Sequence, residues 1–254
     1  MMRFSANLGF LWADLPLPDA IRAAGAAGFD AVECHWPYAT PPAEVSAALR
    51  DTGLEMLGLN TLRGRAGENG LSALPGREAE ARAAIDRALD YAAAIGCGAV
   101  HVMAGLAQGP EAEAAFRANL DHACRRAEAQ GATILIEPLN RRDAPGYFLQ
   151  HAGQAARIIA EAGHPNLRLM FDCYHLQIMD GDLTRRLRVL SPILGHVQIA
   201  AVPDRGPPDH GELDYRHLMG VLADIGWDRP VGAEYRPPGP TGQSLGWMAL
   251  LRGT

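Results

Sequence analysis

The sequence predicts a closed (β/α)8 TIM barrel, and two observations lead to this fold class. Short apolar runs rich in β-forming residues alternate eight times with longer, alanine-rich stretches. The chain has 254 residues, a length that accommodates eight strand–helix units. Because alternating strands and helices form a parallel sheet covered by helices, we expect a barrel with its helices outside.

Most of the eight expected strands are too short to be helices and are bounded by Gly, Pro or Asn. They span residues 3–8, 31–34, 55–59, 99–103, 133–137, 168–171, 195–199 and 231–235.

The stretches between the strands have the apolar spacing of helices. Residues 78–95 place Ile85, Leu89 and Ala92 on one face, and residues 111–130 repeat the pattern. A glycine before the next strand ends many of these helices, because glycine adopts a positive φ at low cost. The expected helix stops are Gly28, Gly53, Gly96, Gly131, Gly163 and Gly226.

No linker, low-complexity stretch or shift in composition interrupts the chain, which predicts a single barrel domain over residues 1–254. A doubly wound open sheet is the alternative fold. Against it, no G-x-G-x-x-G or P-loop motif follows the first strand. The glycine- and proline-rich residues 203–211 follow a strand end and are interpreted as a functional βα loop.

Composition excludes several classes of protein. Apolar residues make up 48% and charged residues 20%, which is ordinary for a globular protein and wrong for a disordered one. The formal net charge of −6 argues against a general nucleic-acid binder, which needs a basic face. A small anionic substrate remains compatible, because a site can be locally positive on an acidic protein.

Cysteine use and hydropathy predict a cytoplasmic protein with reduced thiols and no membrane partner. The four cysteines form no C-x-x-C pair, so a zinc ribbon or thioredoxin-type motif is absent. The N-terminal stretch lacks the pattern of a secretory signal. No window approaches the ~18 apolar residues needed to cross a membrane.

Polar side chains stand where the expected strands end, which is where TIM barrels form their active sites. The last four apolar runs each end in an oxygen-bearing side chain: Glu137, Asp172, Gln198 and Glu234. A buried carboxylate is costly unless it is paired, hydrogen-bonded or bound to a metal. Because oxygen ligands favour hard cations, this set predicts a divalent metal site for Mg²⁺ or Mn²⁺.

The earlier strands carry further polar residues at the same end, namely Asn7, Glu33, Asn60 and His101. We interpret Glu33 as a structural or outer residue of the site that pairs with Arg63 or Arg65. A lone histidine in an apolar strand is more often a satisfied core residue than part of a site, and His101 fits that description.

Several segments together resemble the hydroxypyruvate isomerase branch of the xylose isomerase-like barrels. They are residues 4–8, 32–38, 136–140, 171–175, 196–200, 203–205, 211–215, 232–235 and 244–248. The resemblance covers nearly the whole chain. It implies an aldose–ketose type isomerase without an organic cofactor that acts on a short oxidised substrate. Members interconvert hydroxypyruvate and tartronate semialdehyde, and close relatives isomerise 2-oxo-tetronates.

The resemblance also implies roles for individual residues. A divalent metal would be held by residues Glu137, Asp172, Gln198 and Glu234, and the two glutamates would serve as the acid/base pair. His175 and Arg205 match substrate-contacting positions. Sugar epimerases of the wider superfamily usually have His where Gln198 stands, so the glutamine favours the isomerase branch.

The chemistry of such an isomerisation fits these residue types. A proton leaves one carbon and returns to its neighbour through an enediolate, and a metal stabilises the developing charge. We expect Arg205 to bind the substrate carboxylate and His175 to donate to a substrate oxygen, with His210 a weaker candidate. Asn7 and Asn60 are expected to orient hydroxyl groups.

Three other functions remain open from the sequence. The nearest is a ketose 3-epimerase on the same barrel. A DNA-repair endonuclease would need further histidine ligands and a basic groove, which the net charge of −6 disfavours. The third is a catalytically inactive barrel used for binding. A small molecule is the expected partner, and a homo-oligomer is open because exposed barrel helices often pair.

Overall fold

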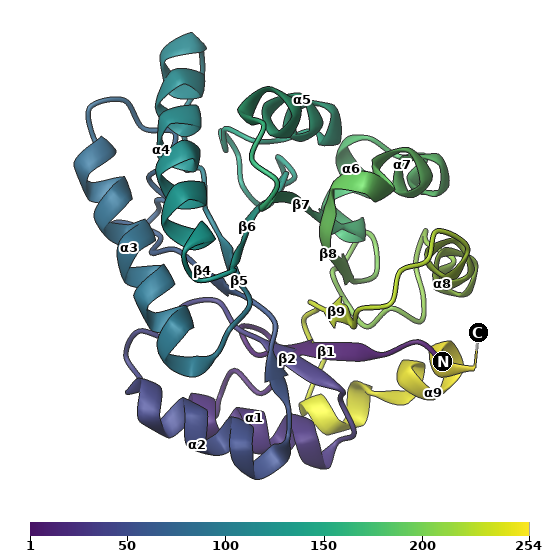
Figure 1. The fold of residues 1–254 in the computed structure, drawn as a ribbon. Helices are drawn as coiled ribbons and strands as arrows, with labels where there is room; N and C mark the ends of the chain where they lie inside the picture. Colours follow the sequence, from purple (N-terminus) through teal and green to yellow (C-terminus); the bar gives the residue numbers. More distant parts are fainter. Residues whose placement is uncertain (254) are drawn as a thin grey trace.

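The computed structural model describes residues 1–253 and shows a ring of helices around a central barrel of strands (Figure 1). The strands are β1 (Phe4–Asn7), β2 (Ala31–Glu33), β3 (Glu55–Met56), β4 (Leu59–Asn60), β5 (Ala99–His101), β6 (Thr133–Ile136), β7 (Leu167–Asp172), β8 (Leu194–Ile199) and β9 (Val231–Ala233). Every strand pairing is parallel. The fold class expected from the sequence is confirmed.

The third expected strand, residues 55–59, is not continuous. It is split into β3, which pairs with β2, and β4, which pairs with β5. The sheet order is β3-β2-β1-β9-β8-β7-β6-β5-β4, so the two ends of the sheet are the halves of one strand. Gly58 lies in the break, where a glycine weakens a strand. The β1–β9 pairing closes the sheet into a barrel, which has eight strands when β3 and β4 are counted as one. This closure excludes the doubly wound alternative.

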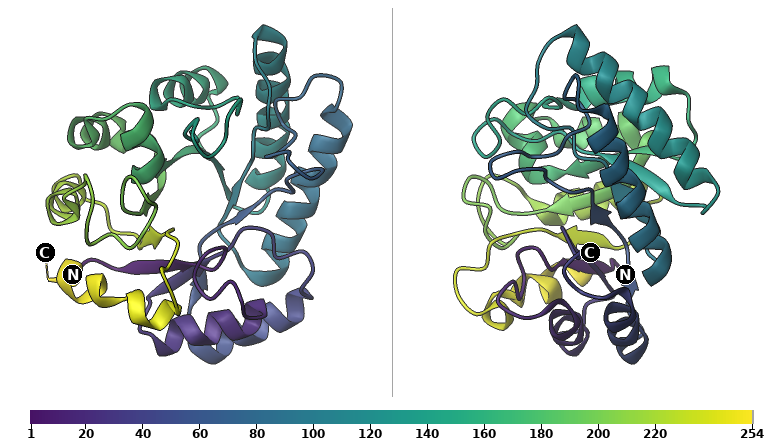
Figure 2. Two further views of the ribbon diagram at one scale, coloured as in Figure 1. Left: turned by 180° about the vertical axis from the view of Figure 1, so that it is seen from behind. Right: turned by 90° about the vertical axis from the view of Figure 1, so that its left-hand side faces the viewer.

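Helices cover the outside of the barrel, as the view from behind in Figure 2 also shows. They are α1 (Leu17–Ala26), α2 (Pro42–Thr52), α3 (Glu78–Ile95), α4 (Pro110–Glu128), α5 (Ala152–Ala162), α6 (Cys173–Met179), α7 (Leu183–Leu190), α8 (Tyr215–Asp224) and α9 (Gly246–Arg252), with 3-10 turns η1 (Ser191–Ile193) and η2 (Thr241–Ser244). The expected helix over 78–95 is confirmed at both ends. The helix expected over 111–130 begins one residue earlier and ends two residues earlier.

The six glycines expected to end helices all have a positive φ, between 64° and 84°. Gly53, Gly96 and Gly163 are the left-handed C-caps of α2, α3 and α5. A side chain is rarely accommodated in this conformation, which is why the short turns into the next strand use glycine.

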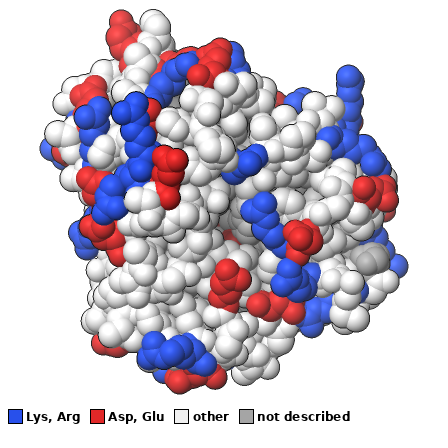
Figure 3. Space-filling view, in the orientation of Figure 1, with Lys and Arg blue, Asp and Glu red and all other residues white. Residues whose placement is uncertain are grey.

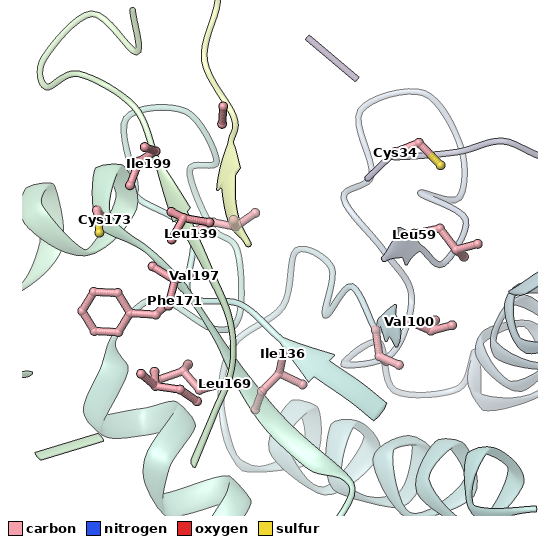
Figure 4. Close-up of a cluster of buried hydrophobic side chains, with 14 of the residues drawn as sticks. Cys34, Leu59, Val100, Ile136, Leu139, Leu169, Phe171, Cys173, Val197 and Ile199 are labelled. Atoms are coloured by element: carbon pink, nitrogen blue, oxygen red, sulfur yellow. The ribbon is translucent and has the colours of Figure 1, made fainter. Parts of the chain in front are cut away.

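Alternate residues of each strand face opposite sides, and this produces two apolar layers. The larger one lies between the barrel and the helices, and it includes Phe171 of β7 and its register partner Val197 of β8 (Figure 4). The smaller one, formed by Ala99, Leu135 and Met170, is a separate cluster. These three residues alternate along β5, β6 and β7 with members of the larger layer, which places them inside the barrel.

The face seen in Figure 3 carries arginines interspersed with aspartates and glutamates rather than one extended basic surface. Among residues 1–253, no helix is both long enough and apolar enough to span a bilayer.

Candidate active site

Each of the eight barrel strands, with β3 and β4 counted as one, places one polar side chain at its C-terminal end on the inside of the barrel. In chain order these residues are Asn7, Glu33, Asn60, His101, Glu137, Asp172, Gln198 and Glu234. Glu137 follows Leu135 by two positions and Asp172 follows Met170 by two, so the alternation that fills the barrel interior continues into the site. Register pairs Asn7 with Glu33, Asn60 with His101 and Asp172 with Gln198.

The centre of the site is a group of three carboxylates and one imidazole. Glu137, Asp172, His175 and Glu234 are all buried, and each offers one ligand atom that lies within 4.8 Å of the others. Asp172 caps helix α6, because its Oδ1 accepts a hydrogen bond from the Tyr174 backbone N–H at 2.8 Å. This fixes the carboxylate and leaves Oδ2 facing Arg205 and His175.

The three carboxyl groups have different proton affinities. Burial, followed by the charges of Glu234 and Asp172, raises the pKa of Glu137 well above its usual value. Burial also raises the pKa of Asp172 to about 8, although Arg205 opposes the shift. For Glu234 burial acts in the same direction, but Arg205 and His35 outweigh it and lower the pKa. Three such groups in one buried space favour a bound cation.

Arg205 brings a positive charge into the carboxylate group. Its Nη2 donates to Glu234 Oε2 at 2.6 Å and to Asp172 Oδ2 at 3.4 Å. The guanidinium lies between the rings of Phe10 and Tyr174, 4.8 and 4.9 Å from their centroids. Arg205 has a φ of 56°, a strained value for a non-glycine residue that is often associated with functional sites.

The hydrogen bonds of His175 identify its tautomer. Its Nδ1 accepts from the backbone N–H of Asn140 at 3.0 Å, so the proton of the neutral ring is on Nε2. Burial, then Arg205, lowers the pKa of His175 well below its usual value, which keeps the ring neutral. Nε2 lies 3.5 Å from Asp172 Oδ2 and 3.9 Å from Glu137 Oε1. In this tautomer Nε2 presents a proton to the carboxylate group, so His175 is a hydrogen-bond donor.

Gln198 has the properties of the remaining oxygen ligand. Its Nε2 donates to Glu33 Oε1 at 2.8 Å, whereas its Oε1 is buried without a hydrogen-bond partner. Glu137 Oε1 is likewise buried and unpartnered. Two unsatisfied oxygens beside two further carboxylates match the oxygen-rich ligand sets of hard divalent cations, so the residues fit a metal of that type.

Cavities lie on both sides of this group. A cleft of about 320 Å³ is lined by the central residues Glu137, His175, Arg205 and Glu234 and by aromatic and arginine side chains. A second cavity of about 260 Å³ reaches from Glu137, Gln198 and Glu234 toward the opposite end of the barrel. Asn60 lines both cavities, and Asn7 lines the second. The cleft is large enough for a small molecule.

Two further histidines, His35 and His101, lie beside the carboxylates of the site. His35 Nε2 lies 2.8 Å from Glu234 Oε1, and its position two residues after Glu33, at the end of β2, was the available signal. His101 is not a satisfied core residue: both ring nitrogens lack a partner, and it lines the cleft 3.6 Å from Glu137. Burial lowers the pKa of His101 to about 4, so it is neutral.

Glu33 and His210 lie in surroundings other than those expected from the sequence. Glu33 pairs with His196 and not with Arg63 or Arg65, because its side chain points into the barrel. His196 was missed, although it is two residues before Gln198 and therefore shares its face. His210 is half-exposed and bound to Asp204 and Asp209, outside the central group.

Comparison with known proteins agrees with the fold. Residues 21–251 match the protein family described as xylose isomerase-like TIM barrel. A crystal structure described as AP endonuclease, family 2, from Brucella melitensis superimposes with a TM-score of 0.95 at 40% identity and covers 98% of this chain and 99% of that one. A 3-keto-D-glucoside 4-epimerase from E. coli has a TM-score of 0.86 at 23% identity over 100% of both chains, which supports the fold alone.

The fold and the buried carboxylate group define a xylose isomerase-like TIM barrel. Within that class, a 2-oxo-tetronate isomerase from Cupriavidus necator is 46% identical over 254 residues, with 98% of each chain covered. A human protein named "Putative hydroxypyruvate isomerase" is 45% identical, covering 97% of this chain and 94% of the human one. The chain belongs to the hydroxypyruvate and 2-oxo-tetronate isomerase family, and the expected enzyme class, an isomerase of that type, is confirmed.

Proposed function

We propose that this protein interconverts the α-hydroxy ketone and aldehyde forms of a short sugar acid. The substrate is hydroxypyruvate, which gives tartronate semialdehyde, or a 2-oxo-tetronate. The observation that carries the proposal is the buried group of Glu137, Asp172, His175 and Glu234 at the C-terminal end of the barrel strands. The relatives of this barrel are named 2-oxo-tetronate isomerase and putative hydroxypyruvate isomerase.

Glu137 and Glu234 are the proposed acid/base pair. The reaction removes a proton from the carbon beside a carbonyl and returns it to the neighbouring carbon, by way of an enediolate. The two glutamates follow β6 and β9, which are separated by two strands, so they approach a bound substrate from different directions. One takes the proton, and the same or the other residue returns it.

A divalent metal, Mg²⁺ or Mn²⁺, would be held by Glu137, Asp172, Glu234 and the free oxygen of Gln198. When bound, it would act as a Lewis acid that stabilises the negative charge of the enediolate. His175 would then donate its Nε2 proton to a substrate oxygen, because its Nδ1 is engaged by Asn140.

Arg205 is the proposed partner of the substrate carboxylate. Although Nη2 is bound to Glu234, the Nε of Arg205 is buried without a partner, and Nη1 has only a 3.8 Å contact with Asp143. These donors are available for a carboxylate in the cleft. Asn7 and Asn60 are assigned to orienting substrate hydroxyls.

Proton transfer by carboxylates is favoured over covalent catalysis through an amine. The sequence contains no lysine, so no side chain of this chain can form a Schiff base with a carbonyl substrate. We also propose a reducing compartment such as the cytoplasm, because all four cysteines are free and buried.

A substrate panel tests the proposal. Purified protein with added Mg²⁺ or Mn²⁺ is expected to convert hydroxypyruvate or a 2-oxo-tetronate and to leave neutral ketohexoses unchanged. Epimerisation of ketohexoses without turnover of any hydroxy-oxo acid would replace the proposed function by a ketose 3-epimerase. No turnover in either set would indicate a barrel used for binding.

A further inference from the structure

The carboxylate of Glu33 lies beneath the proposed metal site and accepts four side-chain hydrogen bonds. Glu33 is only 4% exposed. Its Oε1 accepts from Asn7 Nδ2 at 2.9 Å and from Gln198 Nε2 at 2.8 Å. Its Oε2 accepts from Ser5 Oγ at 3.3 Å and contacts His196 Nε2. A buried carboxylate with this many donors is fixed in place.

The barrel has a specific space for this carboxylate. Gly232 of β9 lies two residues before Glu234, on the inner face. A Cβ at Gly232 would lie 2.8 Å from both oxygens of Glu33 and 2.8 Å from His196 Nε2. Only glycine at this position allows Glu33 to reach the donors from β1 and β8 at the same time.

The hydrogen bond from Gln198 to Glu33 selects one of the two amide orientations. With Nε2 on Glu33, the amide oxygen is the unpartnered atom left on Gln198. A rotation by half a turn would bring the amide oxygen against the Glu33 carboxylate, where two acceptors repel. Asn7 is fixed in the same way: its Oδ1 accepts from the Gly9 N–H, and its Nδ2 bridges Glu33 and Glu234.

We propose that Glu33 is a positioning residue that holds the amide oxygen of Gln198 toward the divalent metal. The inference rests on the proposed function, because it assumes the metal site formed by Glu137, Asp172, Gln198 and Glu234. Glu33 itself does not touch the metal or the substrate. Its effect passes through Gln198, and through Asn7 to Glu234.

A titration with Mn²⁺ in the absence of substrate, monitored by electron paramagnetic resonance, tests the proposal. Outer partners of metal ligands are typically worth about 10–100-fold in affinity, so Glu33→Ala is expected to weaken Mn²⁺ binding by that amount. Glu33→Gln should stay within about threefold of the wild type, because its amide oxygen still accepts from Asn7 and Gln198. An equal loss in both variants would overturn the orienting role and leave only an effect of charge.

A double-mutant cycle separates orientation from general support of the barrel. If Glu33 acts mainly through Gln198, the double variant Glu33→Ala/Gln198→Ala should bind Mn²⁺ little more weakly than Gln198→Ala alone. Fully additive losses would contradict the proposal.

Gly232→Ala provides a second route that leaves Glu33 in the sequence and remains decisive if Glu33→Ala does not fold. The new methyl group should displace the carboxylate and weaken Mn²⁺ binding about tenfold or more. Gly153→Ala on α5 is the matched control, because a Cβ there contacts nothing within 4 Å. Wild-type Mn²⁺ affinity in Gly232→Ala would overturn this inference and leave the proposed function unaffected. If the wild type itself binds no Mn²⁺, the metal part of the proposed function fails, and this inference fails with it.

Discussion

Glu137, Asp172 and Glu234 share one buried space, yet their neighbours give them different charges. Glu234 contacts Arg205 at 2.6 Å and His35 at 2.8 Å, which favours its ionised form. Glu137 has no such partner on Oε1, and burial favours its protonated form. Carboxyl groups of the same type therefore differ in their charge state because of the contacts that each one makes.

The acid/base assignment predicts the effect of removing either carboxylate. Glu137→Gln and Glu234→Gln should each lower kcat by at least about 100-fold, the usual contribution of a positioned acid or base. Steady-state rates on the acid found by the substrate panel provide the measurement. Circular dichroism should show an intact fold in both. Full activity in both variants would remove these residues from the mechanism.

The same two variants should differ in stability. Glu137→Gln replaces a carboxyl group that already favours its neutral form, so the free energy of unfolding should change little. Glu234→Gln deprives the buried Arg205 of its shortest ion pair and should cost about 3 kcal/mol. Urea denaturation measures both values. Equal stabilities would mean that Asp172 alone compensates Arg205.

Strand ends and alternation indicate which side chains face the inside of the barrel, whereas the contacts between those side chains cannot be predicted from the sequence. Glu137, Asp172, Gln198 and Glu234 could be located because strand ends and alternation determine where they face. The pairing of Glu33 with His196 could not, because it joins β2 to β8 across the barrel and depends on the space above Gly232.

At the scale of elements, glycines set the ends of helices and breaks in strands. Gly163 ends α5 with a φ of 68°, whereas Gly153 lies within α5 in an ordinary conformation. The sequence predicted the role of Gly163 because a glycine before an apolar run is a recognisable helix stop. It could not predict the split at Gly58, because the break depends on which neighbour each half of the strand pairs with.

These two glycines of one helix should respond oppositely to the same substitution. Gly163→Ala places a Cβ in the left-handed region and should destabilise the protein by about 1 kcal/mol. Gly153→Ala improves helix propensity in open space and should stabilise it by about 0.5–1 kcal/mol. Thermal unfolding of the two variants checks the signs. Changes of the same sign would contradict this account of the turn.

At the scale of the whole molecule, the barrel and its helices bury all four cysteines. Cys34, Cys97, Cys124 and Cys173 are free, and burial raises the pKa of each thiol, to about 12 for Cys97 and Cys124. The same closed architecture brings eight strand ends together into one site.

Thiol reactivity should therefore report the intact barrel. In the native protein at about pH 8, a chromogenic disulfide reagent should react slowly with the four cysteines, because they are buried and protonated. In concentrated guanidinium chloride all four should react at once. Rapid reaction in the native state would show that the helices open readily from the barrel.

The proposed reaction is the isomerisation of a hydroxy-oxo acid through an enediolate, carried out by carboxylates of this barrel. The most direct test is nuclear magnetic resonance of hydroxypyruvate or a 2-oxo-tetronate turned over in deuterated water. We expect the isomer to form with deuterium at the carbon that receives the proton, and both product and label to form at least about 100-fold more slowly in Glu137→Gln and Glu234→Gln. Isomer that forms at the wild-type rate in both variants would contradict it.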